Sequence, residues 1–424
     1  MTNDKHTKLV EVYITKLVYG GRGIGELPDR KKIFVWNTLP GETVLVRLIK
    51  SRRSYDEAIA EKIIKPSIDR ETPKDADYLS TSPWQMMSFE AENRYKKDII
   101  QELLIQQRVD VQTIDGPTYD DRMWHYRNKM EYSFAGYEND LHLAQYGRSS
   151  HNLRVVEGSA LAMPAIDELA NNMCILLSRS GVKPKDLKSL IIRSTQNKNL
   201  VASLFVSNTL FPYLELPKEL KGLRVHYSQS DNLGPHQAKQ LYEIGDCSLE
   251  DELLNHKFIY DVDSFFQINL PVFEQALNRI KTSCQSSEVV DMYAGVGSMG
   301  LNIASSRVDL VEFDTRMVKL ARINAERLNI KAHVIEASTE NALKYIVPNK
   351  PVIFDPPRSG LHNKIISKLL VARPFKIAYL SCNPATQARD LFRLQAEYKI
   401  TYFEVFNFFP RTPEIETLAI LTAK

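Results

Sequence analysis

The chain has 424 residues, of which 43% are hydrophobic and 25% charged, an ordinary balance for a globular protein. This length exceeds what one hydrophobic core usually serves, so we expect two or three domains. The polar start, MTNDKHTK, does not resemble a signal peptide, and no apolar run is long enough to span a membrane. We therefore expect a cytoplasmic protein with no membrane partner.

The four cysteines, at positions 174, 247, 284 and 382, are widely spaced and form no CxxC pair. This spacing argues against a zinc or iron–sulfur site and against a disulfide framework, so no metal site is predicted. The net charge of +3 decides little by itself, but its distribution is uneven. Residues 1–66 hold 13 Lys or Arg and 8 Asp or Glu, a local excess of positive charge.

The first 66 residues have the pattern of a small β-barrel. Val10, Val12 and Ile14 alternate with polar residues, and further strands are predicted over residues 33–36 and 43–49. A basic cluster lies where the last of these strands ends, formed by Arg47, Lys50, Arg52 and Arg53. Small barrels often bind oligonucleotides. A solvated basic loop on a structural barrel explains the same residues, and the pattern alone leaves both interpretations open.

Residues 67–255 mix helix and strand patterns and are expected to form an α+β central domain. Ser88 is the expected N-cap of a helix that extends to Gln107. Arg127 and Lys129 precede an alternating strand over residues 130–134. In an extended segment these two cations point to one side, which suits phosphate contacts. A basic pair on the surface is the simpler interpretation of the two residues alone.

From about residue 256, strands alternate with helices, which predicts a doubly wound parallel sheet. The strands are expected at residues 289–293, 309–313, 351–354 and 377–380. The helices are expected at residues 270–280, from 301 onward, and at 317–329. In open sheets of this kind, ligands bind at the carboxyl ends of the strands.

A glycine-rich turn, Gly295-x-Gly297-x-x-Gly300, follows the first of these strands and permits close approach of a ligand. Glu312 ends the next strand, where a carboxylate can hold ribose hydroxyls. Both features fit an NAD-dependent oxidoreductase as well as an S-adenosylmethionine (SAM) site. The lack of a second dinucleotide half favours SAM. Asp355, followed by two prolines at a strand tip, also favours SAM, although a structural turn explains that motif too.

Cys382 lies in the stretch LSCNPATQARD, directly after a short apolar run that is typical of a buried strand. A lone cysteine is usually a small core residue. Cys382 differs because the glycine turn and Asp355 precede it and a carboxylate, Glu416, follows near the end of the chain.

Together these segments resemble the RNA (uracil-5-)-methyltransferase family, whose members make 5-methyluridine in 23S rRNA and tRNA. The matching motifs are FFQxN at 265–269, DxYxGVG at 291–297, DPPRxGL at 355–361, SCNPxTxARDL at 381–391 and FPxTxxxE at 409–416. The start of the chain resembles the TRAM domain, an RNA-binding barrel, through YGGRG at 19–23 and LPGE at 39–42. That resemblance favours RNA as the partner of the barrel.

The resemblance implies a role for each matching residue. Cys382 would be the nucleophile and Glu416 the general base. The SAM-binding residues would be Gln267, Tyr293, Gly295, Gly297, Ser298, Glu312 and Asp355. The implied architecture is a TRAM-like β-barrel (1–66), a central RNA-recognition domain (67–255) and a Rossmann-like methyltransferase domain (256–424).

Several positions depart from the family pattern. Many members with a TRAM domain hold an iron–sulfur cluster on four cysteines of the central domain. Here the corresponding stretch, residues 78–85, reads YLSTSPWQ and the last position falls near Gly158, so no cluster is expected. The usual His before the catalytic Glu is Glu414, and the usual Cys of the glycine turn is Ala294. These changes leave the choice of RNA target open.

The implied chemistry explains why a thiol and a carboxylate are needed. Thiolate addition at C6 of uracil makes C5 nucleophilic, and a base must then remove the C5 proton after methylation. Because an ordinary cysteine has a pKa near ~8.5, the site is expected to favour the thiolate. The uracil must leave its stack, which is easiest in an unpaired loop.

Three function classes follow from the sequence. An RNA methyltransferase explains all the motifs, a dehydrogenase explains only the glycine turn, and a non-catalytic RNA-binding protein explains only the TRAM-like start. A TRAM-like segment with a central domain favours 23S rRNA as the substrate, with the T-loop uridine of tRNA as the alternative. We expect the protein to be a monomer.

Overall fold

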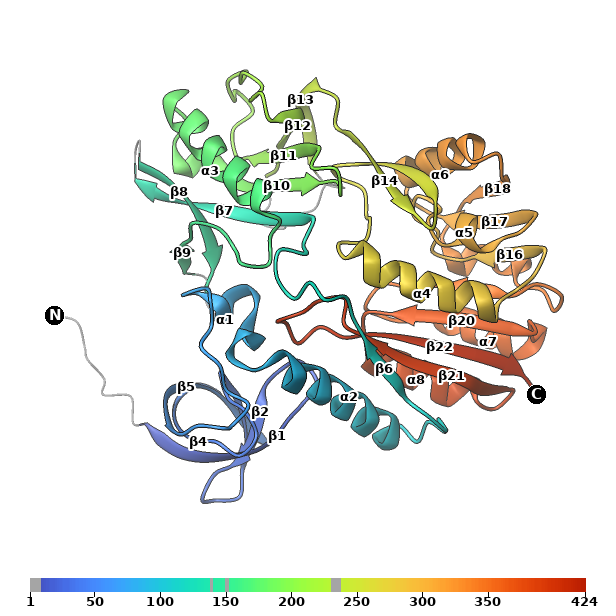
Figure 1. Ribbon diagram of the computed structural model, residues 1–424, viewed down its shortest axis with the longest axis horizontal. Helices are drawn as coiled ribbons and strands as arrows, with labels where there is room; N and C mark the ends of the chain where they lie inside the picture. The colour runs from blue at the N-terminus through green and yellow to red at the C-terminus, as the bar shows by residue number, and fades with distance from the viewer. Residues whose placement is uncertain (1–8, 138–139, 149–151, 230–237) are drawn as a thin grey trace.

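The computed structural model describes residues 9–137, 140–148, 152–229 and 238–424. They form a closed barrel, a central seven-stranded sheet, a two-stranded sheet and an eight-stranded C-terminal sheet. In Figure 1 the barrel lies below the central sheet, and the C-terminal sheet lies beside both. The polar start of the chain, residues 1–8, lies outside the described residues. None of the helices described is both long and apolar enough to cross a membrane.

The barrel has the strand order β1-β2-β3-β5-β4. Its strands are β1 (Val10–Leu17), β2 (Gly23–Glu26), β3 (Lys32–Trp36), β4 (Thr43–Ser51) and β5 (Tyr55–Lys65). Val12, Ile14 and Val35 are buried inside it, which confirms the predicted half-buried strands. The sequence pattern does not reveal β2, whose glycines resemble a break, or β5, whose inward residues include the charged Asp56 and the small Ala58.

The central sheet has the order β13-β12-β11-β10-β7-β8-β9, in which only β11 and β12 are parallel neighbours. Its strands are β7 (Lys129–Tyr137), β8 (Asp140–Tyr146), β9 (Leu153–Val155), β10 (Leu187–Ser194), β11 (Leu200–Val206), β12 (Leu220–Tyr227) and β13 (Lys239–Gly245). Helix α3 (Pro164–Arg179) packs on this sheet, where Leu169 and Met173 share a core with Tyr132 and Leu190. The short elements nearby are α1 (Tyr78–Thr81), η1 (Pro83–Met86) and η2 (Pro184–Asp186).

The C-terminal sheet has the order β18-β17-β16-β19-β20-β22-β21-β6. Seven of its strands are β16 (Glu288–Asp291), β17 (Arg307–Glu312), β18 (Lys331–Glu336), β19 (Val352–Phe354), β20 (Lys376–Ser381), β21 (Tyr398–Phe406) and β22 (Glu416–Ala423). The first five in spatial order are parallel, whereas β22 runs antiparallel between β20 and β21. The helical elements are α4 (Leu270–Ser283), α5 (Gly300–Ile303), α6 (Thr315–Arg327), α7 (Asn363–Ala372), α8 (Pro384–Leu394), η4 (Thr339–Asn341) and η5 (Leu343–Tyr345).

Both faces of this sheet are buried, because successive strand residues enter different cores. Val289 and Ile353 pack with residues of α4 and α6, whereas Val290 and Phe354 pack with residues of α7 and α8. This arrangement confirms the predicted doubly wound α/β fold. Helix α5 is shorter than expected, since it consists of only four residues and ends at Ile303.

Two elements from the first third of the chain join the C-terminal sheet. Strand β6 (Asp115–Thr118) pairs with β21 at the sheet edge. Helix α2 (Phe89–Gln106) begins at the predicted N-cap, where Ser88 Oγ accepts the N–H of Ala91 at 3.2 Å. It buries Ile99 and Ile100 in the same core as Phe354.

Strands β14 (Ser248–Leu253) and β15 (His256–Asp261) pack against the core that contains α4. The domain boundaries at 66 and 255 stay predictions.

Candidate active site

The carboxyl edge of the C-terminal sheet brings together Asp291 and three of the predicted site residues. Asp291 and Glu312 are the last residues of β16 and β17. Asp355 follows β19 and Cys382 follows β20. Because parallel strands end at one edge, these four side chains belong to one region of the molecule, as the sequence predicts.

Glu416 reaches the same edge from the opposite chain direction. It is the first residue of β22, which runs antiparallel to β20. Ser381 pairs with Thr417 in that ladder, and Cys382 and Glu416 are the next residues along the same register. The sheet topology therefore brings the predicted nucleophile and the predicted base to neighbouring strand tips.

The glycine turn is built as the sequence predicts. Gly295 and Gly297 have φ angles of +54° and +88°, in the left-handed region that favours glycine. Asp291 Oδ2 accepts the N–H of Gly300 at 2.8 Å, and Glu312 Oε2 accepts the N–H of Gly295 at 2.9 Å. The two carboxylates thus tie the turn to the strand tips. Ser298 lies half-buried in this turn.

A pocket of about 830 Å³ opens beside the turn. Tyr293 and Glu312 line it, whereas the other predicted cofactor residues do not. Two lining residues that the sequence analysis did not single out are Ser338 and Thr339, which follow β18. These two residues could have been predicted from the strand order. They follow β18, which is parallel to β17 and ends beside Glu312 at the same edge of the sheet.

Gln267 and Asp355 meet at this edge away from that pocket. Gln267 is buried, and its Nε2 lies 3.4 Å from Asp355 Oδ2. The seven predicted cofactor residues therefore fall into three places. They are the pocket wall with Tyr293 and Glu312, the turn with its glycines and Ser298, and the Gln267–Asp355 contact.

Buried carboxyl groups dominate the electrostatics of the site. Burial raises the pKa of Asp291 to about 7, and burial together with Asp291 raises the pKa of Asp355 to about 7. Burial, with Asp355 and Glu414 nearby, also raises the pKa of Glu416 well above its ordinary value. Asp291 Oδ1 and Glu416 Oε2 are buried atoms without a hydrogen-bond partner among the described residues.

Unpartnered acidic oxygens suit a cationic ligand group rather than an anionic one. A sulfonium or ammonium group placed here would compensate the buried carboxylates. The pyrophosphate of a dinucleotide would instead face the acidic groups Asp291, Glu312 and Asp355. The electrostatics therefore fit SAM and oppose NAD, which the glycine turn alone did not separate.

The Cys382 thiol is half-buried, whereas the other three cysteines are buried. Burial, followed by the nearby Glu416 and Asp355, raises its pKa to about 12, and Arg358 opposes this shift. The expectation that the site favours the thiolate is therefore wrong for the protein without ligands. The physical reason is that two acidic neighbours and burial outweigh one cation.

Arg358 and Glu414 form the outer rim of the site. Arg358 Nη2 donates to Glu414 Oε2 at 2.8 Å, and the side chain of Arg358 is 71% exposed. Glu414 is therefore already paired with a cation at the surface, unlike the buried Glu416.

The central sheet holds the segment that carries Gln267. Arg193 of β10 is fully buried and donates to the carbonyl oxygens of Ser264 and Phe266 at 2.8 and 2.7 Å. Asn128 Nδ2 donates to the carbonyl oxygen of Gln267 at 3.1 Å. Asn128, which lies between the cations Arg127 and Lys129, thus holds the backbone of a predicted cofactor residue. No motif in the sequence singles out Arg193.

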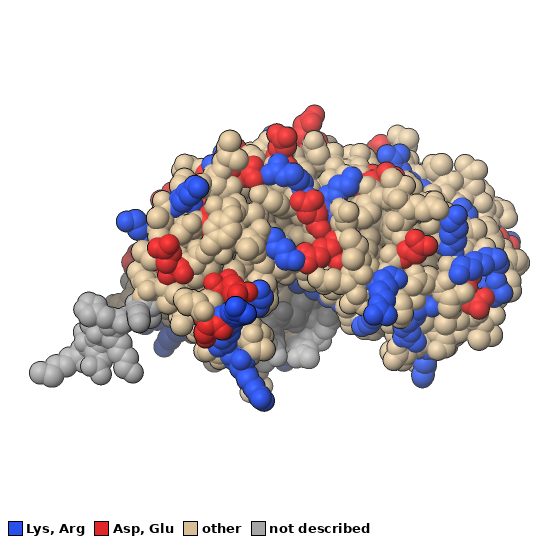
Figure 2. Space-filling view, turned by 90° about the horizontal axis from the view of Figure 1, so that it is seen from below, with Lys and Arg blue, Asp and Glu red and all other residues tan. Residues whose placement is uncertain are grey.

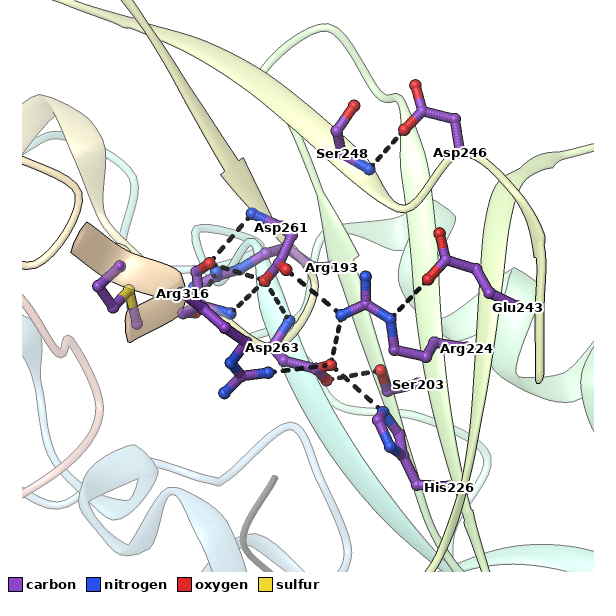
Figure 3. Close-up of polar contacts among 12 residues, drawn as sticks. Arg193, Ser203, Arg224, His226, Glu243, Asp246, Ser248, Asp261, Asp263 and Arg316 are labelled. Carbon is purple, nitrogen blue, oxygen red and sulfur yellow. Dashed lines mark hydrogen bonds and ion pairs between the residues drawn. The ribbon is translucent and has the colours of Figure 1, made fainter. Parts of the chain in front are cut away.

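A second set of contacts anchors the start of this segment, as Figure 3 shows around Asp263. Asp263 accepts hydrogen bonds from Ser203 Oγ at 2.7 Å and from Arg224 Nη1 at 2.5 Å. His226 Nε2 lies 3.2 Å away, and Arg316 of α6 approaches to 3.6 Å. Burial alone would raise the pKa of Asp263, but these donors hold it below its ordinary value. The central and C-terminal sheets are therefore joined through an ionised carboxylate.

Lys129 is not part of an exposed basic pair. Burial and the neighbouring Arg193 lower its pKa to about 8. Lys129 is half-buried and pairs in the central sheet with the buried Arg193, so it does not belong to a solvated surface. The described residues contain no group of three or more His, Cys, Asp or Glu side chains arranged to hold a metal ion.

Comparison with known proteins gives consistent matches. The sequence model of the family described as tRNA (Uracil-5-)-methyltransferase matches residues 342–424, and that of the TRAM domain matches residues 5–60. The model described as Conserved hypothetical protein 95 matches residues 271–376.

Relatives match along most of the chain. A protein of Prochlorococcus marinus, described as an uncharacterized RNA methyltransferase, is 30% identical over 90% of this chain and 99% of its own. A protein of Enterococcus faecalis with the same description is 28% identical over 99% of this chain and 98% of its own. The crystal structure of Pyrococcus abyssi tRNA (uracil-54, C5)-methyltransferase in complex with S-adenosyl-L-homocysteine is 19% identical. It has a TM-score of 0.77 over 97% of this chain and 100% of that one, which shows a shared fold.

The sheet order, the barrel and the carboxyl-lined edge define a methyltransferase of the Rossmann-like class that carries a TRAM barrel. The chain belongs to the RNA (uracil-5-)-methyltransferase family. Neither a dehydrogenase nor a non-catalytic RNA-binding protein accounts for these matches.

Proposed function

We propose that this enzyme uses SAM to methylate C5 of a specific uridine in RNA through a covalent adduct between Cys382 Sγ and C6 of the uracil. The observation that carries this proposal is the register of β20 and β22, which brings a half-buried thiol and a buried, unpartnered carboxyl group to one edge. A nucleophile and a proton acceptor at neighbouring strand tips can act on C6 and on the C5 proton of the same uracil ring.

The reaction proceeds by exchange of bonds at C6 and C5. Cys382 Sγ gives its proton to solvent water and adds as a thiolate to C6, which places negative charge on the ring and makes C5 nucleophilic. When bound, SAM would supply the methyl group that C5 takes, and S-adenosylhomocysteine would be left. Glu416 then removes the C5 proton, the C5–C6 double bond re-forms, and Sγ leaves as thiolate.

The residues present fit SAM as the donor. Glu312 lies at the wall of the pocket and can accept from ribose hydroxyls, while Tyr293 offers an aromatic ring beside it. Gln267 and Asp355 would hold the polar end of the ligand next to Cys382. A cationic ligand beside Asp355 and Glu416 would favour their ionised forms, which the base role of Glu416 requires.

The proposed substrate is a uridine of 23S rRNA, with the tRNA T-loop uridine as the second candidate. The solved structure that shares the fold is a tRNA enzyme by its description, but a likeness of fold alone does not choose the RNA. Mass mapping of 5-methyluridine in 23S rRNA and tRNA from a deletion strain separates the two. Loss of the mark from 23S rRNA supports the proposal, and loss from tRNA alone contradicts it.

The barrel offers a surface that suits single-stranded RNA. Phe34 and Trp36 of β3 and Tyr55 of β5 lie on its outer face, with Phe34 and Tyr55 rings 5.3 Å apart. The guanidinium group of Arg22 lies 5.0 Å from the Phe34 ring, and that of Arg148 lies 4.3 Å from the Trp36 ring. Aromatic and arginine planes together provide stacking sites for unpaired bases.

Figure 2 shows basic and acidic side chains interspersed over the face seen from below. The predicted basic cluster at the end of β4 is nevertheless exposed, and Lys50, Arg52 and Arg53 take part in no ion pair among the described residues. Arg47 is paired with Glu61.

Replacing Lys50, Arg52 and Arg53 together by serine is expected to weaken RNA binding and flatten its salt dependence. Each lost phosphate contact lowers the slope of log K against log salt by about 0.7 for single-stranded RNA, because fewer counterions are released. Fluorescence titration at several salt concentrations measures this change.

The matched control replaces three exposed cations at the far end of the molecule, Lys319, Arg322 and Lys331, by serine (Figure 1). It removes the same net charge and should leave the salt slope unchanged. An equal slope for the barrel variant and the wild type would mean that this basic cluster does not contact RNA.

Replacing Glu312 by alanine is expected to weaken SAM binding by about 1–3 kcal/mol, the usual loss for a charged hydrogen-bond partner. The carboxylate also accepts the N–H groups of Gly295, Phe313 and Asp314, so its removal loosens the turn. Calorimetric titration with SAM measures the affinity. Glu336→Ala, at the tip of the next strand but outside the pocket, is the control. Unchanged SAM affinity in Glu312→Ala would remove Glu312 from the site.

A further inference from the structure

A turn of the N-terminal barrel reaches the active site. Tyr19, in the turn between β1 and β2, donates a hydrogen bond from its hydroxyl group to Asn383 Oδ1 at 2.9 Å. Asn383 directly follows the proposed nucleophile, Cys382. A residue near the start of the chain therefore contacts the nucleophile loop near its end.

Asn383 is a junction of three segments. Its Oδ1 accepts from the Tyr19 hydroxyl and from the N–H of Thr386, which caps the N-terminus of α8. Its Nδ2 donates to the carbonyl oxygen of Arg358 at 2.7 Å. These partners define which way the amide points, because a flipped amide would set its NH₂ group against the N–H of Thr386.

The turn that carries Tyr19 is tightly docked. A Cβ atom added at Gly21 would lie 2.4 Å from Pro413 Cβ, on the segment that leads to Glu416. Trp84 Nε1 donates to the carbonyl oxygen of Gly21 at 3.2 Å. Leu17 and Leu39 of the barrel are buried in the same core as α2 and the C-terminal sheet. The barrel therefore cannot shift without moving this turn.

Tyr19 is placed among the groups of the proposed mechanism. Burial, with Glu414, Cys382 and Glu416 close by, raises the pKa of Tyr19 to about 12, although Arg358 opposes the shift. The phenol therefore keeps its proton at neutral pH and remains a donor to Asn383.

We infer that Tyr19 is a positioning residue for the methyl-transfer reaction, so that the barrel completes the active site in addition to binding RNA. Through Asn383, Tyr19 holds the loop of Cys382 against the loop of Arg358. The inference rests on the proposed function for its kinetic consequence, but the positioning itself is a property of the protein alone.

Two variants test the contact, each with a matched control. Tyr19→Phe removes only the hydroxyl group, and Tyr13→Phe does the same at an exposed barrel tyrosine. Gly21→Ala sets a Cβ against Pro413, whereas Gly20→Ala meets no atom within 4 Å. Gly20 and Gly21 have φ angles of +89° and +87°, so the two alanine variants carry the same backbone strain and differ only in docking.

The first measurement needs no substrate. Hydrogen exchange of the peptide that contains residues 381–390 should be faster in Tyr19→Phe and Gly21→Ala than in the wild type. It should be unchanged in Tyr13→Phe and Gly20→Ala. The second measurement is the single-turnover rate of covalent adduct formation with RNA, which should fall about tenfold in Tyr19→Phe. SAM and RNA affinities should stay at the wild-type level.

The outcomes separate this inference from the proposed function. Unchanged exchange in Tyr19→Phe overturns the positioning role whether or not the protein methylates RNA. A fall in RNA affinity that accounts for the whole loss of rate makes Tyr19 an RNA contact and also overturns it. If the wild type forms no adduct, the proposed function fails, while the exchange data still decide the role of Tyr19.

Discussion

Cys382→Ala is expected to abolish the covalent protein–RNA complex and to lower methyl transfer by on the order of 10⁴-fold or more, as removal of a nucleophile does in covalent enzymes. Without Sγ nothing adds to C6, and C5 remains too electron-poor to take a methyl group. Labelled RNA on denaturing gels measures the complex, and transfer of labelled methyl groups measures turnover. Folding and SAM affinity should be unchanged, because Cys382 is only half-buried at the sheet edge.

Cys174→Ala is the matched control, since it removes a thiol from α3 in the central part of the molecule. It should retain both the complex and turnover. Wild-type turnover in Cys382→Ala would show that the nucleophile is another group, and the proposed adduct mechanism would fail with it.

Glu416→Gln is expected to slow the last step of the reaction, in which the C5 proton is removed and Sγ is released. The amide has nearly the shape of the carboxyl group but does not take up the C5 proton. Attack at C6 and methyl transfer remain possible, whereas release of Sγ slows by about 10²–10⁴-fold, the usual contribution of a general base. A methylated, covalent protein–RNA species should therefore accumulate. Mass spectrometry of the gel-stable species should show the added methyl group, and the species should vanish in the Cys382→Ala, Glu416→Gln double variant.

The pH dependence of Sγ release tests the same role of Glu416. Burial, Asp355 and Glu414 raise the pKa of Glu416, so its proton-accepting form becomes more populated as pH rises. Release of Sγ in the wild type should therefore speed up with rising pH, and Glu416→Gln should lose this dependence. Glu414→Gln removes one of the carboxylates that raise this pKa, so it should keep the pH dependence and move it to lower pH. Normal turnover without trapped adduct in Glu416→Gln would assign the base to another group, with Glu414 the next candidate.

Deletion of the whole barrel is not a clean test of its role in RNA binding. Deleting residues 1–66 would remove Tyr19 together with Leu17 and Leu39, which belong to a core shared with the C-terminal sheet. Loss of activity in such a truncation would not separate RNA binding from positioning of the nucleophile. Point variants in the full chain, at the basic cluster and at Tyr19, separate the two.

Local patterns in the sequence were enough to place the strand tips. Each of Asp291, Glu312, Asp355 and Cys382 directly ends or follows an apolar run, and parallel strands bring their carboxyl ends to one edge. The glycine turn, the barrel strand β1 and the helix capped by Ser88 were likewise predictable, because spacing, φ preference and capping act between residues close in the chain. The same information left the NAD and SAM interpretations of the glycine turn open.

By itself, the sequence determined the doubly wound sheet and the edge that carries the site. Through family resemblance, it also predicted the chemistry that is proposed here for Cys382 and Glu416. Only the tertiary structure decided that β22 runs antiparallel beside β20, that Arg193 and Asn128 hold the Gln267 segment, and that Tyr19 contacts Asn383. It also reversed the expected ionisation of Cys382, because burial and neighbouring carboxyl groups set that pKa. The physical reason is common to all of these. Register, burial and electrostatic surroundings arise from segments that meet through packing, and local propensity carries no information about which distant segments meet.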